Sequence, residues 1–182
     1  GLKGKLVIPD TVTSIGVGVF QDCAGLSEII LPDHWVGVND YMFEGCSGLT
    51  KLVIPEGTTS IGKKAFAGCS GLTGDLRIPE GVERIEEYAF SGCSGLKGRL
   101  VLPQSLTYIG EYGFENCSGL IGELVLPEKL TYIGQYGFYN CSGFSGTLRI
   151  SKSIDIKFLA FCDCSGIEHL ALEDGMTQIG NY

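Results

Sequence analysis

The sequence predicts a solenoid, a coil in which each turn of the chain stacks on the turn before it. The main observation is a cysteine that recurs after 23, 23, 24, 24, 24 and 23 residues. A phenylalanine lies three residues before each of these cysteines, and a glycine lies two residues after it. The recurring cysteines are Cys23, Cys46, Cys69, Cys93, Cys117, Cys141 and Cys164. Because equivalent residues of a solenoid form ladders along its axis, each of these positions is expected to make one layer of a continuous core.

The first segment of each unit predicts a short parallel β-strand. In Leu52-Val53-Ile54 the alternation and the β-branched residues favour a strand with Leu52 and Ile54 pointing inward. A proline ends this segment, because it lacks the amide donor that a central strand needs, and all six prolines of the chain occupy this position. The predicted strands begin near Leu6, Ile29, Leu52, Leu76, Leu100, Leu124, Leu148 and Leu170.

The rest of each unit predicts shorter elements on the other faces of the coil. Thr59–Gly62 favours a second extended segment, Ala65-Phe66 favours one tight helical turn, and Cys69–Gly71 favours a turn into the next strand. An extra glycine before the strand accounts for the 24-residue spacings and is expected to form a one-residue bulge. These glycines are Gly4, Gly74, Gly98, Gly122 and Gly146.

The repeat extends along the whole sequence, so residues 1–182 are expected to form a single domain of about seven units with partial units at both ends. The chain opens inside a unit at Leu2–Gly4 and closes inside another at Met176–Gly180. Solenoids normally need polar caps at their ends, and neither end shows one. We therefore expect a piece of a longer protein, whose uncovered ends can also pair end to end.

Charge and hydropathy exclude several partners. The formal net charge is −8, and acidic residues crowd the turns after the prolines, which disfavours nucleic acid and anionic membranes as partners. No apolar run approaches the length of a membrane span, so no membrane insertion is expected.

The cysteines are expected to be free thiols rather than disulfides. Seven of the eight occupy one phase of the repeat, which places neighbouring side chains about 4.8 Å apart, beyond the usual ~3.8 Å Cβ separation of a bridge. A buried thiol packs as a small apolar group. Cys162 lies outside this ladder at a mostly polar phase, so we expect it to be exposed, either as a reactive thiol or without a role.

No catalytic, metal or cofactor site is predicted. The two histidines, His34 and His169, lie about six turns apart, too far to share a site. Cys162-Asp163-Cys164 lacks the two-residue gap that is typical of zinc ligands. Two tyrosine ladders are predicted as well, and they have two interpretations: packing between turns, or a surface that faces a protein or a glycan. Their members are Tyr88, Tyr112 and Tyr136 in one ladder and Tyr108 and Tyr132 in the other.

Two columns of outward-facing residues follow the predicted strands. One column alternates in sign over its first six members and is expected to neutralise itself across adjacent turns. It consists of Lys5, Glu28, Lys51, Asp75, Arg99, Glu123, Thr147 and His169. The other is an apolar stripe with two arginines, and exposed apolar patches mark interaction surfaces. Its members Ile30, Val53, Arg77, Val101, Val125 and Arg149 form the predicted protein-binding surface.

The units also resemble a known family. Leu52–Pro55, Thr59–Gly62 and Lys64–Leu72 are similar to the BspA-like leucine-rich repeat, in which Ile-Pro, Ile-Gly, Ala-Phe and Cys-x-x-Leu recur in this order. The resemblance implies a right-handed leucine-rich-repeat solenoid on surface or secreted proteins of host-associated bacteria and some parasitic protists. It also implies adhesins that bind host matrix proteins or partner microbes, without a shared catalytic motif.

Together, the stripe and the resemblance predict a non-enzymatic protein-binding or adhesion module that needs no cofactor and is located at the cell surface or secreted. A host extracellular matrix or serum protein is the candidate ligand. The alternative hypothesis is a passive spacer that holds another domain away from the cell, for which only the length of the coil would matter.

Overall fold

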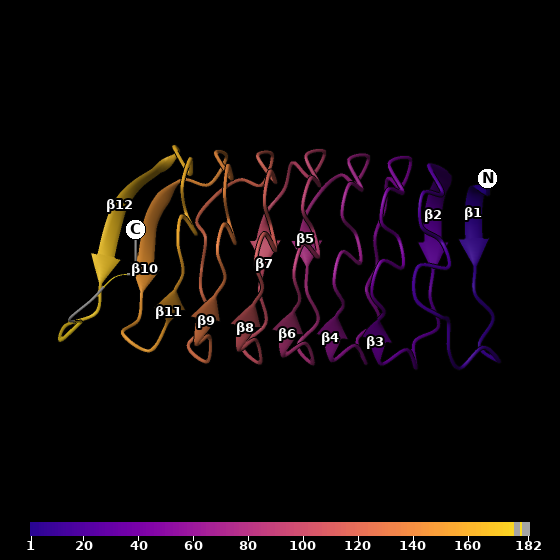
Figure 1. Ribbon diagram of the computed structural model, residues 1–182, viewed down its shortest axis with the longest axis horizontal. Helices are drawn as coiled ribbons and strands as arrows, with labels where there is room; N and C mark the ends of the chain where they lie inside the picture. The colour runs from indigo at the N-terminus through magenta and orange to yellow at the C-terminus, as the bar shows by residue number, and fades with distance from the viewer. Residues whose placement is uncertain (177–178, 180–182) are drawn as a thin grey trace.

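The computed structural model describes residues 1–176 and 179 and shows a parallel β-solenoid of about seven turns. The turns stack along the long axis of the molecule, from β1 at the N-terminal end to β12 at the C-terminal end (Figure 1). Every strand pairing is parallel. The predicted solenoid is thereby confirmed, while most of the closing segment at 177–182 lies outside the described residues.

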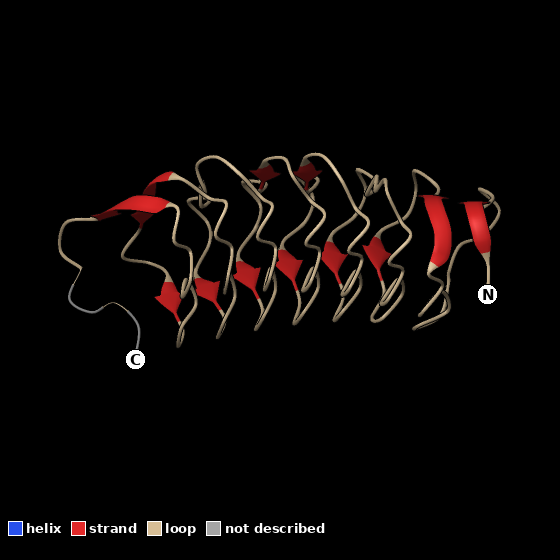
Figure 2. Cartoon of the chain, turned by 90° about the horizontal axis from the view of Figure 1, so that it is seen from above, coloured by secondary structure: helices blue, strands red, loops and turns tan. Residues whose placement is uncertain are grey.

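The longest sheet is formed by the second segment of each turn. Its strand order is β3-β4-β6-β8-β9-β11, and the strands follow one another in a row along one side of the coil (Figure 2). Equivalent isoleucines pair directly, Ile61 with Ile85 and Ile85 with Ile109, so this ladder is buried in register. The strands are β3 (Gly37–Val38), β4 (Ser60–Ile61), β6 (Arg84–Ile85), β8 (Tyr108–Ile109), β9 (Tyr132–Ile133) and β11 (Asp155–Ile156).

Within the described residues, the first segments of the turns form three separate two-stranded sheets instead. These are β1 (Lys3–Val7) with β2 (Gly25–Ile30), β5 (Leu76–Arg77) with β7 (Leu100–Val101), and β10 (Gly146–Ile150) with β12 (Ile167–Leu172). Isolated bridges at Glu28–Lys51 and Gly122–Phe144 add single contacts. The sequence predicted a strand in the first segment of every turn, and this is wrong for the turns at Leu52 and Leu124, where only isolated bridges form. The difference arises because alternating burial shows only which side chains point inward. A residue before a proline is also extended whether or not the neighbouring turns form hydrogen bonds with it.

The helical turn predicted at Ala65-Phe66 is wrong, because this segment consists of turns. Lys64 has φ 54° and Gly68 has φ 72°, and equivalent residues of the other turns repeat these left-handed values. A left-handed residue on each side of the phenylalanine excludes a right-handed helix. Alternate amides bond instead to the next turn: Lys64 N donates to Glu87 O at 2.8 Å, and Phe66 N to Ala89 O at 2.8 Å. Among the described residues there is also no helix with the length and apolar character to span a membrane.

Two side-chain ladders fill the core. The rings of Phe66, Phe90 and Phe114 are fully buried and stack with centroid distances of 5.3 Å at both steps. The thiols form a second ladder, since Cys69 Sγ donates to the carbonyl of Phe43 at 3.1 Å and the equivalent bond recurs from Cys46 to Cys164. All eight cysteines are free, which agrees with the free thiols predicted for the seven recurring cysteines. Burial raises the pKa of the Cys46 thiol to about 11.

Two smaller predictions have different outcomes. Gly4 and Gly146 have φ 76° and 79°, and the strand register shifts directly after each of them, which confirms the predicted bulge at these positions.

Cys162, predicted to be exposed, is half-buried. It lies in the turn segment, where its carbonyl accepts a hydrogen bond from Asn140 N at 2.9 Å, and this contact with the preceding turn explains its partial cover.

Candidate protein-binding face

The predicted stripe lies exposed along the first segments of the turns. The exposed fractions are 39% for Ile30, 60% for Val53, 38% for Val101 and 63% for Val125. Arg77 and Arg149 are exposed as well. We call these six residues, together with Val7 at 54% exposure, the apolar stripe. Surface valines are common singly, but here exposed apolar side chains recur in successive turns, at Val7, Ile30 and Val53 and again at Val101 and Val125.

The sequence places these side chains outward by simple alternation. Leu76 and Ile78 are buried on either side of Arg77, and Leu100 and Leu102 are buried on either side of Val101. Strand register then aligns members of the stripe in adjacent turns: Val7 pairs with Ile30, and Arg77 pairs with Val101. The structure therefore brings the predicted residues together as one row, although the sheet below them is interrupted.

Two shallow hollows of the described residues lie along the stripe. One, of about 370 Å³, is lined by Val53, Arg77 and Val101 together with the carboxylates of Glu56 and Glu80. The second, of about 310 Å³, is lined by Arg149, Ala171, Leu172, Glu128 and Glu173. Each hollow thus combines apolar side chains, one arginine and acidic groups, which gives a partner both contact area and polar groups that fix its orientation.

A row of carboxylates borders the stripe at the residue after five of the six prolines. Asp10, Asp33, Glu56, Glu80 and Glu128 are exposed, and in the described part of the chain none of them forms an ion pair. We call these five residues the acidic ridge. The sequence showed acidic residues after the prolines, but it did not show that they share hollows with the stripe, because this depends on how tightly the chain turns at each proline.

The column of alternating charge on the other side of the stripe is only partly paired. Lys5 Nζ lies 3.3 Å from Glu28 Oε2, the one ion pair between adjacent members of this column in the described residues. Asp75 accepts a hydrogen bond from the backbone N of Arg99 at 2.8 Å and lies 3.7 Å from Arg77. The predicted pairing between adjacent turns is therefore found at one step, Lys5–Glu28, while Asp75 contacts the backbone of the next turn and Arg77 of its own turn.

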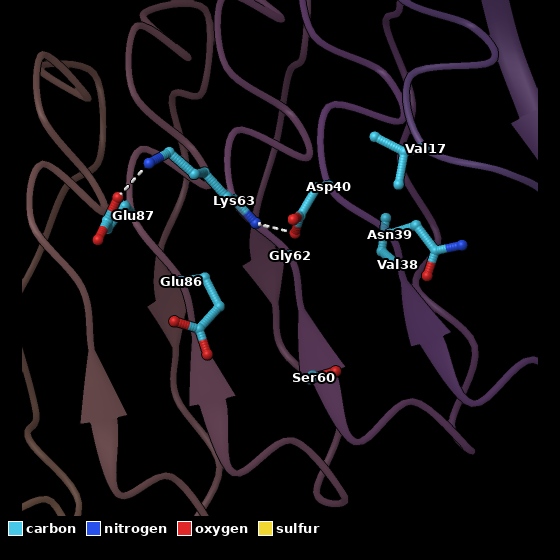
Figure 3. A pocket seen from close by; sticks show the side chains of 9 residues that line it. All are labelled: Val17, Val38, Asn39, Asp40, Ser60, Gly62, Lys63, Glu86 and Glu87. Atoms are coloured by element: carbon cyan, nitrogen blue, oxygen red, sulfur yellow. Dashed lines mark hydrogen bonds and ion pairs between the residues drawn. The ribbon is translucent and has the colours of Figure 1, made fainter.

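A further hollow of about 530 Å³ lies where strands β3 and β4 meet the turns that follow them, and it has charged walls (Figure 3). Its lysine side chain is already paired within the chain, since Lys63 Nζ lies 2.5 Å from Glu87 Oε2. The backbone N of Lys63 donates a hydrogen bond to Asp40 Oδ1 at 2.8 Å. Glu87 raises the pKa of Lys63 through the hydrogen bond and its negative charge. Because the one lysine that lines this hollow is already paired with Glu87 within the chain, the hollow is a weaker candidate site than the stripe.

The tyrosine ladders are stacked face to face. Tyr112 lies 4.5 Å from Tyr88 and 4.9 Å from Tyr136, and Tyr108 lies 4.8 Å from Tyr132, measured between ring centroids. The guanidinium of Arg84 lies 3.8 Å from the Tyr108 ring centre. Since neighbouring rings and cations cover the aromatic faces, the stacking favours packing between turns over the alternative of a ligand platform.

The histidines are not brought together. His34 follows β2, where its Nε2 lies 3.2 Å from the carbonyl of Val12, and His169 lies in β12 at the far end of the coil. Within the described residues, no group of three or more histidine, cysteine or acidic side chains is arranged to hold a metal ion. Trp35 is buried at 5% exposure and belongs to the core.

Comparison with known proteins gives a consistent result. The sequence profile described as BspA type leucine rich repeat region matches in six copies, over residues 3–98 and 73–182. No curated protein matches significantly. The leucine-rich repeat protein TpLRR of T. pallidum is similar in structure, with a TM-score of 0.60 at 20% identity, covering 97% of this chain and 85% of the other.

Two further crystal structures are similar. A leucine rich cell surface protein of Faecalibacterium prausnitzii A2-165 has a TM-score of 0.50 at 22% identity, covering 96% of this chain and 60% of the other. A leucine-rich repeat protein of Bacteroides ovatus ATCC 8483 has a TM-score of 0.48 at 21% identity, covering 98% and 63%. The chain thus spans less than two thirds of the length of these two proteins.

Proposed function

Because this chain belongs to the BspA-type leucine-rich repeat family, we propose that it is a non-enzymatic protein-binding module that docks its partner on the apolar stripe. The observation that carries the proposal is the row of exposed apolar side chains from Ile30 to Val125, with an arginine at every third turn from Arg77 to Arg149. Removing such a row from water stabilises a complex, and the arginines and carboxylates beside it fix the orientation of the partner.

We further propose a location at the cell surface or in the secreted fraction, and a role in adhesion. The description of the F. prausnitzii structure as a cell surface protein supports the location. A host extracellular matrix or serum protein is the candidate ligand. A binding assay of the full chain against a panel of such proteins would identify it.

We expect the double variant V53D/V101D to lose binding to such a ligand while the fold is kept. Both side chains point to solvent, so the free chain tolerates the charge, whereas the complex must bury two carboxylates against apolar surface. Affinity should fall by at least about thirtyfold, the effect of a hot-spot residue. Isothermal titration calorimetry measures the affinity, and circular dichroism measures the fold.

The matched control is V17D/V36D. Val17 and Val36 are 65% and 69% exposed but lie on other segments of the turns, so this variant should bind as the parent chain does. Equal affinity of V53D/V101D and the parent chain would place the binding surface elsewhere. Binding to no protein at all would favour the passive spacer.

A further inference from the structure

We propose that the segment docking on the apolar stripe is a basic amphipathic helix that lies along the solenoid axis, with its apolar face on the stripe and lysine or arginine side chains on the acidic ridge. This inference rests on the proposed function and adds the chemistry and the shape of the partner. It comes from two parallel rows of opposite character: the stripe has one residue in each turn, and the ridge has one carboxylate after five of the six prolines.

The first argument is charge. The acidic ridge contributes five carboxylates and the apolar stripe two guanidinium groups, so the combined surface keeps three negative charges (five minus two). Arg77 lies 3.7 Å from Asp75, outside the ridge, which offsets its charge further. Glu56 and Glu80 form no ion pair in the described part of the chain. Glu80 Oε2 accepts a hydrogen bond from Gln104 N at 3.1 Å, and a cationic partner can pair with these carboxylates without breaking an existing ion pair.

The second argument is adjacency. Glu56 and Glu80 line the same hollow as Val53 and Val101, and Glu128 lines the same hollow as Arg149. A ligand that fills either hollow with an apolar side chain therefore brings its neighbouring side chains within reach of a carboxylate. The ridge is interrupted at Gln104 and ends at Lys152, which lies 2.8 Å from Glu173. The surface thus extends from the first turn to Glu128.

The third argument is spacing. Turns of the coil repeat about every 4.8 Å, and turns of an α-helix repeat every ~5.4 Å. Over five turns the two repeats differ by about 3 Å, which long lysine side chains can absorb. A helix also presents two adjacent rows on one side, an apolar row at i, i+4 and i+7 and a flanking polar row. An extended strand turns successive side chains to opposite faces, so it matches two side-by-side rows poorly.

The test uses the full chain and synthetic peptides about five helical turns long. One peptide carries leucine at i, i+4 and i+7 with lysine on the flank. A second replaces each lysine by glutamate, and a third has the composition of the first in scrambled order. We expect the lysine peptide to bind at least about tenfold more tightly than either of the others, with an affinity that falls as salt is added.

Two charge variants with the same change in net charge separate local from overall attraction. E56Q/E80Q removes charge from the acidic ridge, whereas E111Q/E115Q removes it from the turn segments. We expect the ridge variant to weaken the lysine peptide by at least about fivefold and the turn variant by less than about twofold. Equal weakening by both variants, tighter binding of the glutamate peptide, or equal binding of the scrambled peptide would each overturn the inference.

The same set of variants keeps this inference apart from the proposed function. If V53D/V101D abolishes binding of a verified protein ligand while E56Q/E80Q leaves it unchanged, the apolar stripe is the docking surface and only the basic helix is wrong. If sedimentation instead shows that the chain forms a dimer that V53D/V101D dissociates, a second copy of this chain covers the stripe, and the inference is overturned as well.

Discussion

Replacing Phe90 by alanine should destabilise the fold by about 3–5 kcal/mol, as for other buried aromatic side chains. The Phe90 ring is fully buried and stacks on two neighbours, Phe66 and Phe114, at 5.3 Å each. Its loss leaves a cavity in the middle of the ladder, and rings on both sides lose contacts. Urea denaturation followed by circular dichroism gives the change in the free energy of unfolding.

The end of the same ladder provides the control. Phe20 is 8% exposed and stacks on one described ring, that of Phe43, at 5.6 Å. Phe20→Ala should therefore cost clearly less than Phe90→Ala, because the ring has fewer contacts to lose and water already reaches it. Equal losses at the two positions, or a loss below about 1 kcal/mol at Phe90, would contradict a ladder whose strength comes from stacking on both sides.

The second large effect is expected for Gly119→Ala. A Cβ built on Gly119 would lie 2.0 Å from the carbonyl oxygen of Leu96 in the preceding turn. Because the obstacle is backbone, the two turns must move apart to make room. Overpacking costs typically about 1–3 kcal/mol, and we expect a loss at or above the upper end of this range. Thermal and urea unfolding measure it.

Gly16→Ala is the matched substitution. Its new Cβ would meet one atom, Val19 Cγ2 at 3.6 Å, which is ordinary contact. We expect it to be neutral or slightly stabilising, since alanine restricts the unfolded chain. A Gly119→Ala variant as stable as Gly16→Ala would show that the turns are not in close contact at this glycine.

Much of this architecture could be predicted because every repeat unit carries similar residue types at the same positions. The phenylalanine, cysteine and isoleucine ladders follow from period alone, and so does the outward direction of Val53 and Val101. The helical turn at Ala65-Phe66 was predicted wrongly although a signal was present. The residue before every ladder cysteine is glycine, asparagine or aspartate, the types that best tolerate left-handed backbone.

Other features could not be predicted from this sequence. Whether the first segments pair depends on the distance between adjacent turns, and the buried pattern at Leu76 and Ile78 does not encode this distance. The stripe was visible as a column in the sequence, but its contact with the acidic ridge was not. Glu80 and Val101 belong to different turns, so their shared hollow appears only when one turn is placed on the next.

The central claim, one buried side chain per turn in a continuous stack, is tested most directly by maleimide labelling of the folded chain, resolved by residue with peptide mass spectrometry. We expect Cys23 and Cys162, which are half-buried, to react. Cys69 and Cys141 should stay unlabelled until the chain is unfolded, because burial both hides them and raises the pKa of their thiols. Labelling of Cys69 and Cys141 in the folded chain as fast as Cys162, or a disulfide between neighbouring ladder cysteines, would contradict the stacked coil.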